Sequence, residues 1–304
     1  MNISTIESAP LLGQPRAATQ SPSDPLRFSM GVALVVFATY FFTTSRLNEN
    51  LQALGLFSLL GSIVFIDQIA RTWWVWVIIA LSLAAGIAMR PLDVPNHHIL
   101  LTYIAIAIAL CLSAPEDQRI PLLQHNARWL IVALMGIATL QRLFQPTFMS
   151  GDYISYEIVT GGFLYPLLKL LPETSSIIHE NREIAESFRN SPPSETASVA
   201  LVSPFPMLPL LAKAFVAVII AIEAWICIAM WARPKWIVTH LSILAFAVSL
   251  AVIRQELTFI SVVCMLGLLT CDPQWRKLRW TYGISAALFA AAVVKTVNLP
   301  EPLQ

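Results

Sequence analysis

Arg142 is the residue with the clearest chemical potential in this sequence, because it is a cation inside a long apolar stretch. Residues 130–153 read LIVALMGIATLQRLFQPTFMSGDY, and the stretch is interrupted at Pro146 and Gly151. A charged side chain at the centre of a bilayer costs roughly 3 kcal/mol or more, so Arg142 must face protein, water or the membrane surface. Two interpretations stay open. Its guanidinium binds a ligand oxygen, or it extends to the lipid headgroups.

Other polar residues stand at the ends of neighbouring apolar runs. Arg254 and Glu256 interrupt the apolar region 236–271, and Asp152 directly follows Gly151. We predict that they meet in a shallow, outward-facing polar pocket; the alternative for each is a solvated turn or an ordinary interfacial residue. The candidate ligand-binding residues are Arg142, Asn96, His97, Asp152, Arg254 and Glu256.

Two further ionisable residues lie deeper in apolar runs. Glu223 is about nine residues from the end of its run, which is roughly 13 Å at 1.5 Å per residue. A carboxyl group at that depth must be protonated or paired. We expect His240, early in the next run, to be its partner, since both belong to the inner half. A structural pair and a proton-handling role both stay open.

The composition predicts a membrane protein. Mean hydropathy is +0.68, and only 12% of residues are charged, against about 25% in soluble domains. Many apolar runs approach or exceed the roughly 17 residues that cross a bilayer. We therefore predict an all-α, polytopic helix bundle with eight or nine transmembrane helices. The four cysteines form no CxxC pattern, so no metal site is predicted, and nothing indicates nucleic-acid binding.

The apolar runs define the expected transmembrane domain, residues 26–297. Residues 1–25 are expected to be a disordered tail, 298–304 a C-terminal tail, and 114–126 and 272–279 loops. The region 236–271 would measure about 54 Å as one helix, so we divide it in two; a re-entrant segment is the alternative. The predicted spans are 26–44, 51–66, 72–89, 96–113, 127–147, 206–232, 236–253, 257–271 and 281–297.

One long connection, residues 148–205, is expected outside the cytoplasm. The apolar segment 163–171 is too short to cross a membrane, so it should lie in the interface or pack under the loop. Residues 177–188 place Ile177, Ile178, Ile184 and Phe188 at helical spacing, which predicts an amphipathic surface helix. The whole connection is long enough to cover the predicted pocket.

The distribution of basic residues predicts the orientation. Ten Lys and Arg residues fall on one side of the nine spans and seven on the other, and three of those seven lie in the long loop. Because short basic loops stay in the cytoplasm, we expect a cytoplasmic N-terminus. The expected location is the bacterial plasma (inner) membrane, with a eukaryotic endomembrane as the alternative.

The segment around Arg142 is similar to a known motif. RLFQPTFMSG, from Arg142 to Gly151, resembles the Lys-Leu-x-x-Pro-x-Trp-Leu-x-Gly pattern of the vitamin K-dependent γ-carboxylase-like (HTTM) family. Other residues occur in an order similar to that of the family, over roughly residues 30–280. They are Asn96-His97-His98, Glu223, His240 and the segment 272–277. The resemblance implies a bundle of eight or nine helices with its site towards the extracytoplasmic side, and a quinone as a ligand.

The sequence departs from the carboxylases at the position of the base. The resemblance implies that a lysine at the Arg142 position deprotonates reduced vitamin K. A guanidinium keeps its proton at ordinary pH, so Arg142 cannot be that base, but it can bind a carboxylate, phosphate or quinol oxygen. The sequence ends at Gln304, and we expect it to lack the large extramembrane domain of the carboxylases. Glutamate carboxylation is therefore not expected.

Three functions follow from these observations. The first is an HTTM-like membrane protein that binds a quinone or another lipid-soluble ligand around Arg142. The alternative is a non-catalytic membrane subunit or assembly partner of a larger complex, and the third is a transporter. Expected partners are membrane lipids and another membrane protein. No soluble-enzyme motif is present, so no catalytic residue is assigned.

Overall fold

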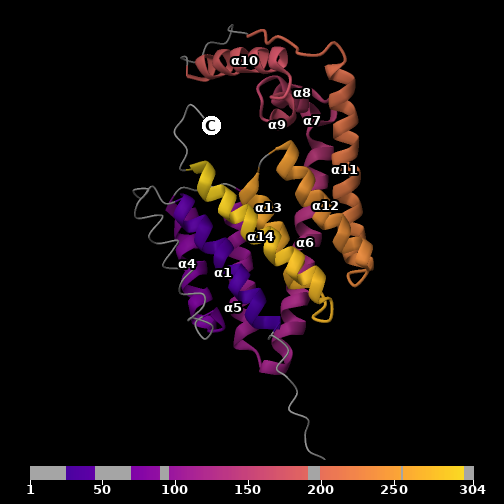
Figure 1. Ribbon diagram of the computed structural model, residues 1–304. Coiled ribbons are helices and arrows are strands. Elements are labelled where there is room, and N and C mark those ends of the chain that lie inside the picture. Colours follow the sequence, from indigo (N-terminus) through magenta and orange to yellow (C-terminus); the bar gives the residue numbers. More distant parts are fainter. Residues whose placement is uncertain (1–24, 45–69, 90–95, 191–198, 255, 298–304) are drawn as a thin grey trace, which may run out of the picture.

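The protein is a bundle of long helices with shorter helices lying across one end (Figure 1). A computed structural model describes residues 25–44, 70–89, 96–190, 199–254 and 256–297. All elements in these ranges are helical, which confirms the all-α class. The long helices are α1 (Pro25–Thr44), α4 (Trp73–Met89), α5 (Asn96–Ser113), α6 (Glu116–Phe144), α11 (Leu208–Ala232), α12 (Ile237–Ile253), α13 (Leu257–Thr270) and α14 (Arg276–Val297).

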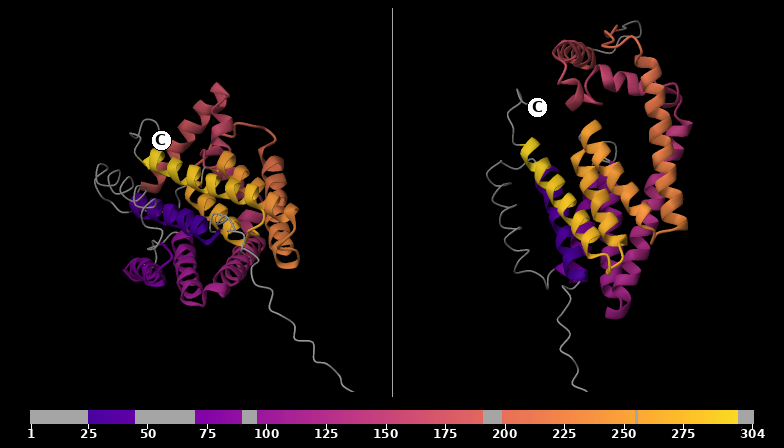
Figure 2. Two further views of the ribbon diagram at one scale, coloured as in Figure 1. Left: turned by 60° about the horizontal axis from the view of Figure 1, so that its bottom comes forward. Right: turned by 45° about the vertical axis from the view of Figure 1, so that its right-hand side comes forward.

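Helix α13 forms the centre of the bundle. Every residue from Ile260 to Cys271 is buried, and α13 contacts α1, α5, α6, α12 and α14. A Cβ atom at Gly267 would lie 2.3 Å from Cε1 of Tyr282, so this glycine lets α14 approach α13 closely. The other helices surround this core, with α1 beside α14 and α11 beside α12 in both views of Figure 2.

Helix α6 is longer than predicted at its start. The polar segment 114–126 was expected to be a loop, but α6 begins at Glu116 and continues through Pro121 to Phe144. Two acidic residues in its first turn favour the helix N-terminus. Residues four apart then face the core, and their burial outweighs the local effect of one proline in the second turn. These are Leu123, Ala127, Ile131 and Met135.

Helix α6 ends three residues before the predicted boundary. Gln145 is extended, with φ −95° and ψ 106°. A residue that precedes proline is disfavoured in the helical region, and Pro146 follows directly. The chain therefore turns away from the α6 axis at this point.

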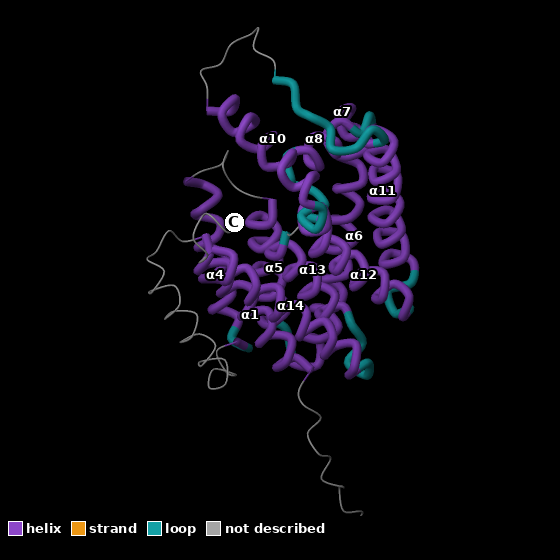
Figure 3. The backbone as a smooth tube through the Cα atoms, turned by 45° about the horizontal axis from the view of Figure 1, so that its top comes forward, coloured by secondary structure: helices purple, strands orange, loops and turns teal. Residues whose placement is uncertain are grey.

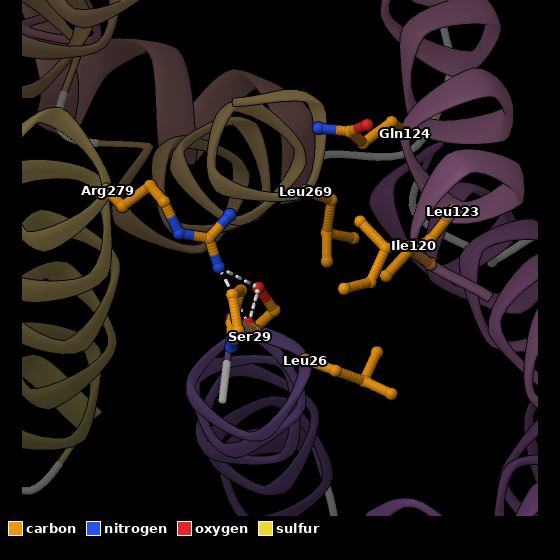
Figure 4. Close-up of a pocket in the computed structure, with 8 residues that line it drawn as sticks. Leu26, Ser29, Ile120, Leu123, Gln124, Leu269 and Arg279 are labelled. Carbon is orange, nitrogen blue, oxygen red and sulfur yellow. Dashed lines mark hydrogen bonds between the residues drawn. The ribbon is translucent and has the colours of Figure 1, made fainter. Parts of the chain in front are cut away.

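The basic segment 272–279 is only partly a loop, because α14 begins at Arg276. Arg279 is buried, and its guanidinium donates to the carbonyl oxygens of Cys271 at 3.3 Å and Pro25 at 2.7 Å, and to Oγ of Ser29 at 2.8 Å. These bonds join the starts of α1 and α14 to the end of α13. Figure 4 shows the guanidinium at the edge of a small, mainly apolar pocket between α1, α6 and α13.

The remaining boundaries agree closely with the predicted runs. The region 236–271 forms two helices with a sharp turn at Arg254, as expected. The predicted helix 51–66, nearly all of the N-terminal tail and the C-terminal tail lie outside the described residues. Two described helices, α6 and α11, are long and apolar enough to cross a membrane; α1, α4, α5, α12 and α13 contain shorter apolar helices.

The predicted long connection contains three short helices and the 19-residue helix α10 in its described part. They are α7 (Pro146–Met149), α8 (Asp152–Val159), α9 (Tyr165–Leu168) and α10 (Pro172–Asn190), and Figure 3 shows them gathered at one end of the bundle. We call this the α10 end. Helix α10 has the expected amphipathic pattern, with Ile178 buried. Phe163, Leu164 and Leu168 are also buried, so the segment 163–171 packs under the connection.

Candidate functional site

Arg142 and Glu223 form an ion pair between α6 and α11. Arg142 lies in the last turn of α6, and Nη1 contacts Oε1 of Glu223, in the middle of α11. The Glu223 side chain is only 3% exposed, whereas that of Arg142 is 27% exposed. Glu223 is thus the more deeply buried partner, whereas part of the Arg142 side chain is exposed although its Nη1 atom is buried.

The predicted pair between Glu223 and His240 is wrong. His240 is buried, and its Nε2 donates to the carbonyl oxygen of Pro234 at 3.0 Å. The hydroxyl of Tyr282 donates to the backbone oxygen of His240 at 3.0 Å and lies 3.2 Å from Nδ1. His240 therefore faces α14, whereas Glu223 faces α6. The imidazole has a structural role that is separate from the ion pair.

The break after α6 places an aromatic ring beside Arg142. The ring centre of Phe148, in α7, lies 5.4 Å from the guanidinium carbon, close enough for a cation–π interaction. Gly151 then reverses the chain with φ +87°, and a Cβ atom there would lie 3.3 Å from the backbone nitrogen of Lys213. Only glycine adopts this conformation at little cost. Pro146 and Gly151 together make the corner that holds Phe148 in place.

Arg254 lies next to this pair, at the end of α12. Its Nη2 donates to the Tyr153 hydroxyl at 3.0 Å, and its Nε lies 2.8 Å from Oε1 of Glu256. The Tyr153 ring lies 6.0 Å from that of Phe148, so the two aromatic residues connect Arg254 to Arg142. Arg142 also interacts electrostatically with Arg254, Glu256 and Tyr153. We call these six residues, Glu223 and Phe148 included, the arginine site.

Negative groups surround Arg254 and compensate its charge. Burial lowers the pKa of Arg254, but the negative charges of Glu256 and Glu157 and the Tyr153 hydroxyl raise it more, so the pKa lies above its ordinary value. Arg254 therefore keeps its proton at any physiological pH. Each guanidinium has a carboxylate in contact, Glu223 for Arg142 and Glu256 for Arg254.

Half of the predicted ligand-binding residues converge, namely Arg142, Arg254 and Glu256. His97 does not join them: its ring packs 5.4 Å from that of Tyr40, at the start of α5. Asp152 is exposed and accepts a hydrogen bond from Ser150 at 2.6 Å, within its own turn. The side chain of Asn96 lies outside the described residues. The start of α5 packs against α4, and its histidines contact Tyr40 of α1, so His97 belongs to that side of the bundle.

Three residues near the arginines were missing from the predicted site. Phe148 and Tyr153 supply the aromatic contacts, and Glu157 adds a carboxylate near Arg254. Tyr153 and Glu157 are four residues apart and therefore share one face of a helix. That spacing is visible in the sequence. No group of three metal-ligating side chains occurs within the ranges described here.

Comparisons with protein-family models, with curated proteins and with solved structures find no match for this chain.

Proposed function

We propose that this chain is a polytopic membrane protein that binds a quinone or another lipid-soluble ligand at the arginine site. The outward surface of α11 supports the membrane environment. Large apolar residues that are 43–63% exposed follow its whole length, and an apolar surface of this extent is rare on soluble monomers. They are Leu210, Val218, Trp225, Ile228 and Trp231.

The proposed orientation places the α10 end outside the cytoplasm. Helix α14 starts at the opposite end of the bundle from α10 (Figure 1), and its first turn contains Arg276, Lys277 and Arg279. Short basic segments favour the cytoplasmic side. The proposed location is the bacterial inner membrane, with eight or nine crossings and the N-terminus in the cytoplasm. The arginine site then opens near the outer headgroups.

The observation that carries the ligand proposal is the partly exposed side chain of Arg142. Its position is fixed by Glu223 on one side and by Phe148 on the other, while more than a quarter of its side chain stays exposed. A fixed guanidinium beside two aromatic rings suits a ligand with an apolar body and an oxygen-containing head group. The resemblance of residues 142–151 to the HTTM family supports a quinone.

The test is mass spectrometry of small molecules that co-purify with the protein in mild detergent. The wild type and Arg142→Ala are compared with Arg142→Lys and with Arg189→Ala, which removes an exposed arginine of α10. We expect a stoichiometric lipid-soluble molecule in the wild type and in Arg189→Ala. The amount of this molecule per protein should fall at least tenfold in Arg142→Ala and should be partly retained in Arg142→Lys.

Two results would contradict this function. Retention of the same molecule in Arg142→Ala would remove Arg142 from the binding site. A stoichiometric protein partner without any small molecule would instead support the assembly function, with Arg142 as a structural residue.

A further inference from the structure

Glu223 has one carboxylate oxygen that the fold does not use. Oε1 contacts Arg142, whereas Oε2 is buried and has no hydrogen-bond partner among the described residues. A buried acceptor without a partner costs about 1–3 kcal/mol. The side chain is only 3% exposed and its other oxygen contacts Arg142, so Oε2 is enclosed by protein. A hydrogen-bond donor from a bound molecule would satisfy it.

The charges of the arginine site favour an uncharged ligand. Arg142 and Arg254 already have carboxylate partners in Glu223 and Glu256, and Glu157 adds a further negative charge near Arg254. An anionic ligand would have to displace one of these carboxylates. A neutral molecule with a hydroxyl group needs no displacement, because its oxygen can accept from Arg142 while its proton faces Glu223.

We propose that Glu223 accepts the hydroxyl proton of a neutral, lipid-soluble phenol at this site. This inference rests on the proposed ligand-binding function. The O–H bond of the ligand breaks, the proton bonds to Oε2, and the electron pair stays on the ligand oxygen, which Arg142 holds. The reverse step returns the proton, and neither an oxidant nor a reductant takes part.

The neighbouring residues are less suitable as acceptors. A guanidinium keeps its proton, which excludes Arg142 and Arg254. The Glu256 side chain is 43% exposed and lies beside Arg254, on the solvent side of the site. Among the residues that the structure describes, Glu223 alone combines contact with Arg142, burial and a free oxygen.

The experiment uses 2-dodecyl-4-nitrophenol, an apolar phenol whose phenolate has its own visible absorbance band. The probe is added to the full-length protein in weakly buffered detergent, at a pH where the free probe is neutral. Absorbance reports phenolate formation, and a water-soluble pH indicator reports protons released to the buffer. Protein-free micelles give the background, and Glu183→Gln, an exposed carboxylate of α10, is the matched control.

In the wild type and in Glu183→Gln, we expect bound phenolate without proton release, because Glu223 keeps the proton. In Glu223→Gln, phenolate should fall at least tenfold, or form only with release of about one proton per probe. Glu223→Asp retains the carboxylate and should restore phenolate without release. This second variant also keeps the test decisive where Glu223→Gln does not fold.

The possible failures are distinguishable. If Glu223→Gln forms phenolate without proton release, as the wild type does, another residue is the acceptor. If the wild type binds the probe only as the neutral phenol, the proton-transfer inference is wrong and the ligand-binding function stands. If the wild type does not bind the probe, and Arg142→Ala also retains the small molecule that co-purifies with the wild type, both proposals fail.

Discussion

Arg142 of α6 and Glu223 of α11 form an ion pair, with Glu223 as its buried member, that joins the two longest helices in the described part of the chain. The pair lies where the bundle ends and the short helices α7 and α8 begin. It therefore connects the helices of the bundle to the segment that covers the α10 end.

Replacing one member of this pair should destabilise the protein far more than replacing both. Arg142→Leu alone leaves the buried Glu223 carboxylate without its partner, which typically costs about 3–5 kcal/mol, and Glu223→Leu should cost less because Arg142 is partly exposed. The double variant removes both charges and should recover most of that loss. Thermal unfolding of the wild type, the two single variants and the double variant in the same detergent completes this double-mutant cycle. Additive losses in the double variant would show that the two side chains are not coupled.

Tyr153→Phe should loosen α8 without unfolding the bundle. It removes the hydroxyl that accepts from Arg254, and a hydrogen bond to a charged group contributes about 1.5–3 kcal/mol. Hydrogen exchange should become faster in residues 152–159. Tyr156→Phe, an exposed tyrosine on the same helix, is the control and should leave the exchange rates unchanged. Equal effects of the two variants would exclude a specific role for the Arg254 contact.

Gly151→Ala should destabilise the corner after α6. The left-handed backbone at Gly151 costs a non-glycine residue about 1–2 kcal/mol, and the added Cβ would also crowd Lys213. The control is Gly136→Ala in α6, where the helical backbone suits alanine and the nearest obstacle is the Cys227 sulfur at 3.3 Å. Thermal unfolding compares the two. A larger loss of thermal stability for Gly136→Ala than for Gly151→Ala would contradict the structural role of Gly151 at this corner.

Single cysteines should report the two ends of the bundle from opposite sides of the membrane. In a variant whose four native cysteines are replaced by alanine, Glu183→Cys lies in α10 and Lys277→Cys lies in the first turn of α14. A membrane-impermeant maleimide should label Glu183→Cys in intact cells and Lys277→Cys only after permeabilisation. The reverse pattern would overturn the proposed orientation.

The sequence predicted the helices better than the contacts between them. Apolar runs such as 96–113 identify helices directly, because burial or lipid contact requires them. The start of α6 was not predictable in this way, since Pro121 and its polar neighbours indicate a loop. That segment is helical because Leu123, and the residues at four-residue intervals after it, pack in the core against other helices.

The ion pair was missed for a different reason. Counting residues from the end of each apolar run placed Arg142 and Glu223 in opposite halves of the bundle. That count assumed that all helices end at the same height. Helix α11 instead starts beyond the end of α6: Leu208 and Ala212 pack with residues of α7 and α8. This offset brings Glu223 level with Arg142. Offsets of this kind depend on how the connection folds, which periodicity does not reveal.

The burial of α13 has a consequence for how the protein is made. A 14-residue helix is about 21 Å long, less than the roughly 30 Å of a bilayer core. Alone in lipid, it would leave its polar ends inside hydrocarbon, and only the surrounding helices relieve that mismatch. One of them, α14, is synthesised after it. For the proposed membrane protein, the packing around α13 is therefore completed only after α14 has been synthesised.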